Sequence, residues 1–149
     1  MLPRNISMQL STYLFFDGNA EEAIAFYAQA LDAEVLFKMR FGEAPVDDSQ
    51  CATTPPFPAD KIMHASLKIG DGLLMLSDGN MCEEEKKHGG YAVSLHSNDL
   101  TQGKIWFERL SEGATVTMPF QETFWALGFG MLTDKFGIPW MVNVEKAMG

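Results

Sequence analysis

The chain is short of cysteine and of long apolar runs. Its 149 residues include only two cysteines, Cys51 and Cys82. They are far apart and form no C-x-x-C pair, so the sequence indicates neither a zinc knuckle nor a disulfide framework. No apolar run approaches the ~20 residues of a membrane-spanning helix, and the first ten residues lack the apolar core of a secretory signal. We therefore expect a soluble protein of a reducing compartment, the cytoplasm.

Positive charge is also scarce. Lysine plus arginine number 11 and aspartate plus glutamate number 20, which gives a formal net charge of −9. Phosphate contacts need clustered lysine and arginine, so this balance argues against a nucleic-acid partner. It also disfavours binding to an anionic membrane surface.

Two catalytic signatures are missing as well. No G-x-S-x-G nucleophile motif occurs. No glycine-rich loop joins a strand to a helix in the way that binds a nucleotide cofactor. The residues alone therefore do not name a reaction, and whether the chain catalyses one stays open.

What the sequence has in quantity is apolar material. Apolar residues make up 46% of the chain, with 11 Phe, 10 Met and 3 Trp. This length corresponds to one domain. A chain of this size buries enough surface to fold without a disulfide or a metal.

The first half of the chain is predicted to form a strand, a helix and three more strands. Alternating apolar residues predict a strand over 10–16. Asn19 and Glu22 have the spacing of a capping box, which predicts the start of a helix over 21–31. The predicted buried stripe of this helix consists of Ala23, Ile24, Phe26, Tyr27 and Leu31. The further strands are predicted over 34–41, 62–69 and 73–77.

The second half repeats this order. Asp99 and Gln102 follow Asn19 and Glu22 by the same offset of 80 residues. They predict the start of a second helix, which carries Trp106, Phe107 and Leu110. The strands of this half are predicted over 91–96, 114–118, 129–133 and 138–144.

We therefore predict an α+β fold of two βαβββ modules, residues 8–80 and 88–146, that together form one domain. Neither half can bury both faces of a four-stranded sheet alone. The two curved mixed sheets should pack side by side and enclose a cleft. The first module carries a proline-rich loop over 42–61, which cannot be a strand. Loops of this length are usually functional or disordered, so a lid over the cleft and a surface excursion both stay open.

The doubled pattern resembles the vicinal oxygen chelate superfamily of glyoxalase I, bleomycin-resistance proteins and extradiol dioxygenases. It is most similar to the PhnB-like branch. The residues that carry the resemblance are YLFFDGNAEEAIAFY at 13–27, HASLKIGDGLLMLSD at 64–78 and QETFWALGFGMLTDKFGIPWMVNV at 121–144. The resemblance covers residues 8–146 and suggests Met8 as an alternative start.

The resemblance implies one metal site, to which each module contributes a residue of its first strand and a residue of its last. Enzymes of the superfamily hold a divalent metal with four side chains, mostly His, Gln and Glu. The corresponding positions fall near Thr12, Ser77, Ala92 and Met141, none of which is a good ligand. A shift of register would bring in only Asp78 or His96. We therefore predict that the usual metal site is lost, with a divalent metal held in some other way as the open alternative.

Three residues are the candidates for ligand binding: His64, Glu122 and Trp125. His64 opens a strand after the long loop and could act as a base, a hydrogen-bonding group or a metal ligand. The alternative is a strand-end histidine that hydrogen-bonds locally. Glu122 either faces a cleft, where burial would raise its pKa, or lies exposed in a turn. Trp125 could stack on a flat ligand.

Three other residues are given structural roles. Trp140 is expected to pack in the core at the seam between the modules. Asp134 is expected to fix a hairpin turn through its own backbone contacts. His96 is expected to support the cap of the second helix.

The leading hypothesis is a PhnB-like small-molecule-binding protein without the usual metal site. Superfamily members usually pair modules across or within chains, so a homodimer is expected. The first alternative is a divergent metal-dependent lyase, isomerase or dioxygenase. The second is a dimeric interaction protein without a ligand. A phosphonate ligand does not follow from the resemblance, because Arg4, Arg40 and Arg109 are scattered and the chain is acidic.

Overall fold

The computed structural model describes residues 9–43, 58–79 and 88–146. The first module contains β1 (Thr12–Phe15), α1 (Ala20–Leu31), β2 (Glu34–Arg40), the 3-10 turn η1 (Phe41–Glu43), β3 (Ile62–Ile69) and β4 (Gly72–Ser77). The second contains β5 (Val93–Ser97), α2 (Leu100–Leu110), β6 (Thr115–Gln121), β7 (Ala126–Thr133) and β8 (Pro139–Glu145). This order confirms the predicted repeat. Most of the loop 42–61, both cysteines and Met8 lie outside the described residues.

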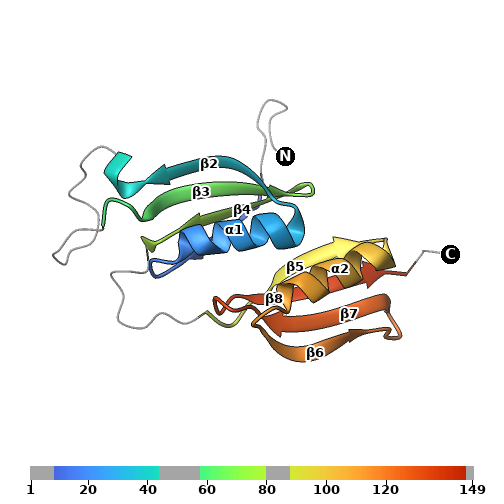
Figure 1. Cartoon of the computed structure of the whole chain (residues 1–149). Coiled ribbons are helices and arrows are strands. Elements are labelled where there is room, and N and C mark those ends of the chain that lie inside the picture. Colours follow the sequence, from blue (N-terminus) through green and yellow to red (C-terminus); the bar gives the residue numbers. More distant parts are fainter. Residues whose placement is uncertain (1–8, 44–57, 80–87, 147–149) are drawn as a thin grey trace, which may run out of the picture.

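Each module forms its own four-stranded mixed sheet (Figure 1). The strand order is β1-β4-β3-β2 in the first sheet and β5-β8-β7-β6 in the second. In both sheets the first strand runs parallel to the last, as in the pairs Leu14 with Leu76 and Leu95 with Val142. The remaining pairings are antiparallel. The two sheets therefore share one topology, which confirms the predicted α+β class.

The helices join the two modules into one core. α1 covers one face of the first sheet, α2 covers one face of the second, and the two helices contact each other (Figure 1). All five residues of the predicted stripe of α1 are buried. Trp140 of β8 is fully buried, and its ring packs edge-on against Tyr27 of α1 at 5.3 Å. This confirms the expected place of Trp140 at the seam. No helix in the described part of the chain is long and apolar enough to cross a membrane.

The cap of α1 differs from the prediction. Asn19 precedes the helix, but its side chain makes no capping hydrogen bond. The N–H of Ala20 instead donates to Asp78 Oδ1 at 2.9 Å, from 58 residues further along the chain. The Asn19 capping-box prediction was wrong because it assumed a local partner. The prediction for α2 is confirmed, since Asp99 accepts hydrogen bonds from the N–H groups of Thr101 and Gln102.

Asp134 holds the turn between β7 and β8, as predicted, and also ties that turn to the first module. Its Oδ1 accepts from the N–H groups of Phe136 and Ile138. Its Oδ2 accepts from the Tyr27 hydroxyl at 2.5 Å and from Trp140 Nε1 at 2.8 Å. Burial raises the pKa of Tyr27 well above its ordinary value, and the Asp134 carboxylate raises it further. Tyr27 therefore stays protonated and donates this bond.

The face of each sheet that carries no helix exposes large apolar side chains. Side chains alternate along a strand, so Tyr13 and Phe15 lie on the opposite face of β1 from the buried Leu14. Phe15 is 45% exposed. The second sheet exposes Met118 of β6 in the same way, because Met118 pairs with Met131 next to the buried Leu132. We call these surfaces the helix-free faces. They remain solvent-accessible within the described part of the chain.

Candidate functional site

A cavity of about 420 Å³ lies at the seam between the modules. We call it the seam cavity. Its walls come from the start of β1, the turn between β3 and β4, the strand β5, and single side chains of α2 and β8. The lining residues are Leu10, Ser11, Thr12, 69–74, 93–96, Trp106 and Trp140. The two modules thus enclose a cleft between them, as the sequence predicted.

Two of the lining residues, Ser94 and His96, are exposed and belong to a polar cluster. His96 Nε2 lies 2.8 Å from Ser94 Oγ, and His96 Nδ1 lies 3.4 Å from Asn143 Nδ2. Ser94 and His96 line the cavity, whereas Asn143 stands behind them on the neighbouring strand β8. His96 was expected to support the cap of α2. That prediction was wrong, because the cap is made by Asp99 and the His96 ring turns to Ser94 and Asn143 instead.

His64 belongs to a second cluster, on the helix-free face of the first sheet. Its Nδ1 lies 3.0 Å from the Tyr13 hydroxyl oxygen, and its ring lies 5.8 Å from that of Phe37. Tyr13 also stacks on Phe15 at 4.9 Å. We call these four residues the first-sheet cluster. Partial burial raises the pKa of Tyr13, and a hydrogen bond with Ser77 opposes that change.

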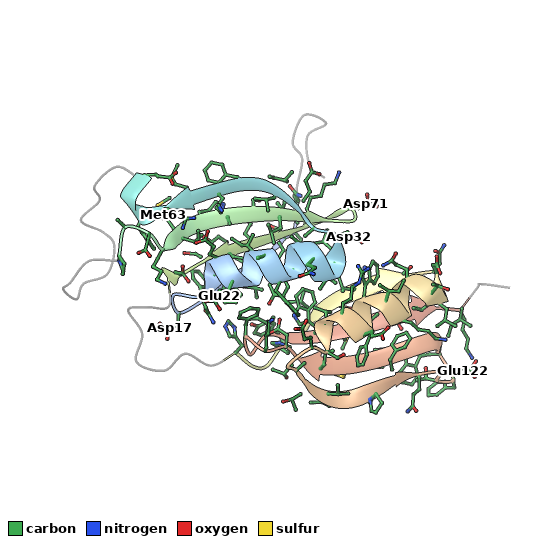
Figure 2. All side chains as sticks on the ribbon, viewed as in Figure 1. Asp17, Glu22, Asp32, Met63, Asp71 and Glu122 are labelled. Atoms are coloured by element: carbon green, nitrogen blue, oxygen red, sulfur yellow. The ribbon has the colours of Figure 1, made fainter. Side chains whose placement is uncertain are left out.

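Glu122 and Trp125 lie apart from both clusters. Glu122 follows the end of β6, is exposed, and lies at the outer end of the second module (Figure 2). Trp125 is 47% exposed and packs edge-on against Phe124 and Phe129. The contacts of His64 with Tyr13 and Phe37 are all within the first sheet. The single chain therefore does not bring the three predicted binding residues together, and none of them lines the seam cavity.

The residues at the implied metal positions do not fit a divalent metal. Thr12, Ala92 and Met141 offer no strong ligand. Ser77 is buried and accepts a hydrogen bond from the N–H of Gly79. Across residues 9–43, 58–79 and 88–146, no three of His, Cys, Asp and Glu gather in a group that could hold a metal ion.

The two donors that a register shift could bring in are also engaged. Asp78 caps α1 and accepts from the N–H of Ile62. His96 has both ring nitrogens next to partners. No step of a reaction is therefore assigned to a metal.

Sequence reasoning missed Ser94 and Asn143. The available signal for Ser94 was its place two residues before His96 in a predicted strand, which puts both side chains on one face. Asn143 carried no such signal, because it lies 47 residues from its partner His96. Only the parallel pairing of β5 with β8, which sets His96 opposite Asn143, brings them together.

Comparison with known proteins gives a consistent result. A family model described as the glyoxalase/bleomycin resistance protein/dioxygenase superfamily matches residues 9–142. The chain is 44% identical over 143 residues to protein YjdN of Escherichia coli (strain K12), covering 93% of this chain and 97% of that protein.

Two solved structures extend the comparison. The crystal structure of protein PA1353 from Pseudomonas aeruginosa matches with a TM-score of 0.83 and 38% identity, over 95% of this chain and 100% of the other. A Bacillus cereus PhnB protein, described as a putative 3-demethylubiquinone-9 3-methyltransferase, matches with a TM-score of 0.73. Its identity is 22%, over 92% of this chain and 99% of the other, and it therefore supports the fold alone.

Proposed function

The chain belongs to the glyoxalase/bleomycin resistance protein/dioxygenase superfamily, and on this premise we propose that it is a PhnB-like small-molecule-binding protein that works without the usual metal site. The observation that carries the proposal is the seam cavity. Its volume of about 420 Å³ falls in the range of small-molecule pockets, about 300–1,000 Å³. Binding needs only a shaped apolar wall and a few polar anchors.

We propose further that the chain acts as a homodimer in the cytoplasm. The support for the dimer is the set of large apolar side chains exposed on the helix-free faces, among them Tyr13, Phe15 and Met118, since exposed apolar patches mark interaction sites. A second copy could lay its second sheet over the first sheet of this chain. That pairing would bring the first-sheet cluster next to Glu122 and Trp125, which one chain keeps apart. His64, Glu122 and Trp125 stay our predicted binding residues on this basis.

The methyltransferase activity named for the Bacillus cereus protein is not extended to this chain. Its sequence has no glycine-rich loop between a strand and a helix for a nucleotide cofactor. The exposed helix-free faces favour a second candidate function, a dimer whose surface is its purpose and which binds no ligand.

Thermal-shift screening of a metabolite panel, with and without divalent metals, tests the proposal. We expect at least one metabolite to raise the melting temperature without added metal, because binding to the folded state stabilises it. If no metabolite shifts the melting temperature and the protein is a dimer, the interaction function replaces the binding function. Stoichiometric Zn, Ni, Mn or Fe in the purified protein, lost in His64→Ala, would instead support the metal-dependent enzyme.

A further inference from the structure

The first-sheet cluster lies on one face of a single sheet. Tyr13 lies on the opposite face of β1 from the buried Leu14, and His64 lies on the opposite face of β3 from the buried Ala65. The His64 ring is 5.5 Å from the Tyr13 ring and 5.8 Å from the Phe37 ring. Phe37 is 45% exposed. A molecule that contacts the His64 ring on this face is therefore also within reach of the Phe37 ring.

Ser77 supports Tyr13 from the neighbouring strand β4. It pairs with Phe15 in the parallel ladder, which puts it on the face that Tyr13 and Phe15 share, and it is only 5% exposed. Burial raises the pKa of Tyr13, and the hydrogen bond with Ser77 opposes that rise, as a bond donated to the phenol oxygen does. Ser77 Oγ itself accepts from the N–H of Gly79. The Ser77 hydroxyl therefore donates to Tyr13, and the Tyr13 hydroxyl hydrogen is left for another acceptor.

That acceptor is His64 Nδ1, which lies 3.0 Å from the Tyr13 hydroxyl oxygen. An imidazole nitrogen is a stronger base than a phenol oxygen, so the phenol O–H donates and Nδ1 accepts. A neutral His64 then carries its hydrogen on Nε2. Within residues 9–43, 58–79 and 88–146, no group pairs with Nε2. The Nε2–H is therefore free for water or for a ligand.

The surroundings of this N–H define a class of molecule. Phe15 and Phe37 are both half-exposed. The four residues of the first-sheet cluster include no carboxylate and no lysine or arginine. Aromatic surface beside a single polar anchor is typical of small-molecule sites. The cluster fits a flat molecule that carries a hydrogen-bond acceptor.

We infer that Tyr13 is the positioning residue of a binding site on the first sheet, where it holds His64 with its hydrogen on Nε2. This N–H donates to an acceptor oxygen of the ligand, whose flat apolar part packs against the Phe37 ring. The inference rests on the proposed binding function and adds to it a ligand class and roles for Tyr13, Ser77 and Phe37.

The position of the His64 hydrogen can be measured directly. Long-range ¹H–¹⁵N NMR of the full-length protein distinguishes the two ring nitrogens, at a pH about two units above the ordinary histidine pKa of about 6.5. We expect the hydrogen on Nε2 in the unaltered chain and a mixture of both forms in Tyr13→Phe, which keeps the ring and removes the hydroxyl. Tyr91→Phe is the matched control, because it removes a hydroxyl 2.6 Å from His88 Nδ1. It should leave His64 unchanged. A packing role of Tyr13 alone would not move this signal.

Two probes then test the ligand class. Methyl phenyl sulfoxide and methyl phenyl sulfide share one ring and differ by one acceptor oxygen. Each is titrated into the protein and followed through the amide signals of residues 62–66 and the His64 ring signals. We expect His64→Ala to weaken sulfoxide binding about tenfold more than sulfide binding, which corresponds to about 1.4 kcal/mol and to one hydrogen bond. Tyr13→Phe should give a smaller difference, about threefold, because the donor remains but is no longer held in one form.

Several results would overturn the inference: a His64 hydrogen on Nδ1, an unchanged His64 in Tyr13→Phe, no sulfoxide binding, or equal losses for both probes in His64→Ala. The dispersion of the NMR spectra shows whether each variant is folded. If His64→Ala does not fold, Tyr13→Phe, which removes a single oxygen atom, decides the question.

Sulfoxide shifts centred on residues 93–96 of the seam cavity would also reject this site while leaving the proposed function intact. The proposed function fails separately, when no metabolite of the thermal-shift panel binds at all. A panel metabolite that binds His64→Ala as tightly as the unaltered chain would retain the function and reject the site.

Discussion

Each module has a buried aspartate at the end of one of its strands, and the two aspartates have different partners. Asp78 follows β4 and accepts hydrogen bonds from the N–H groups of Ala20 and Ile62, so both of these partners lie in the first module. Asp134 follows β7 and accepts from Tyr27 of the first module as well as from its own turn. Both are almost fully buried.

This difference shows that two modules of the same topology can be stabilised by different hydrogen bonds. In the first module, Asp78 accepts hydrogen bonds from the first residues of α1 and β3 and so fixes both starts. The second module begins α2 with the local cap Asp99, which leaves Asp134 to join the modules. The same order of strands and helix therefore does not require the same set of stabilising contacts.

The largest effect is expected from removing the contact that joins the modules. Asp134→Ala leaves two backbone N–H groups, the Tyr27 hydroxyl and the Trp140 indole N–H without their acceptor. We expect the free energy of unfolding to fall by about 4 kcal/mol, because unsatisfied buried donors carry their full desolvation penalty. Urea denaturation followed by tryptophan fluorescence measures the change.

Tyr27→Phe is the matched control for that variant, because it removes only the bond between the modules. We expect a loss of about 2 kcal/mol, typical of a hydrogen bond to a charged group. If the free energy of unfolding falls by the same amount in both variants, the turn contacts of Asp134 contribute nothing to stability. The role of Asp134 is then confined to joining the modules.

Removing the helix caps is expected to give the next largest loss of stability. These variants compare the long-range cap of α1 with the local cap of α2. Asp78→Ala removes the acceptor of two backbone N–H groups, and we expect a loss of about 2–3 kcal/mol. Asp99→Ala removes a local cap and should lose about 1 kcal/mol. Asn19→Ala should change the free energy of unfolding by no more than a few tenths of a kcal/mol, because the Asn19 side chain makes no capping bond. A loss in Asn19→Ala equal to that in Asp99→Ala would contradict the long-range cap of α1.

The close packing of α2 on the second sheet predicts a smaller loss. A Cβ added at Gly130 would lie 2.9 Å from the Phe120 Cα and 2.7 Å from the Phe107 ring. Backbone cannot move aside easily, so Gly130→Ala should lose about 2 kcal/mol by overpacking. Gly128→Ala meets only the ring end of Phe120 and a methyl of Leu100 and should lose less. Thermal denaturation ranks the two variants, and the reverse order would reject this explanation of the Gly-Phe-Gly motif.

The smallest effect is expected from the surface ion pair of the first module. The hydrogen bond from Arg40 lowers the pKa of Glu21 to about 2, and the charges of Arg40 and Lys38 add to the change. A lowered pKa stabilises the fold above the ordinary value of 4.5, and this contribution is lost as the pH falls toward 2. Because the pair is exposed, the contribution is small and is reduced by salt.

A ¹³C NMR titration of the Glu21 carboxyl group measures that pKa. We expect Arg40→Gln to return it toward 4.5, and a high salt concentration to do so in part. A Glu21 titration that is the same in Arg40→Gln as in the unaltered chain would rule out the ion pair as the cause.

Much of the fold could be predicted from residue patterns because those patterns are local. The 80-residue offset predicted the repeat, and the apolar spacing in α1 predicted its buried stripe. The turn role of Asp134 followed from its place before Lys135, Phe136 and Gly137. The candidate site was harder to predict, because its polar cluster joins two strands that the chain reaches far apart in sequence.

The sequence by itself determined two βαβββ modules, the local cap Asp99 and the buried face of α1, since periodicity and capping act over a few residues. The tertiary structure decided the partners of Asp78, Asp134 and His96. Those partners lie 58, 107 and 47 residues away, and they meet only once the two sheets have formed and packed. A buried polar group takes whichever partner the packing brings within hydrogen-bond distance, and no local pattern records which one that is.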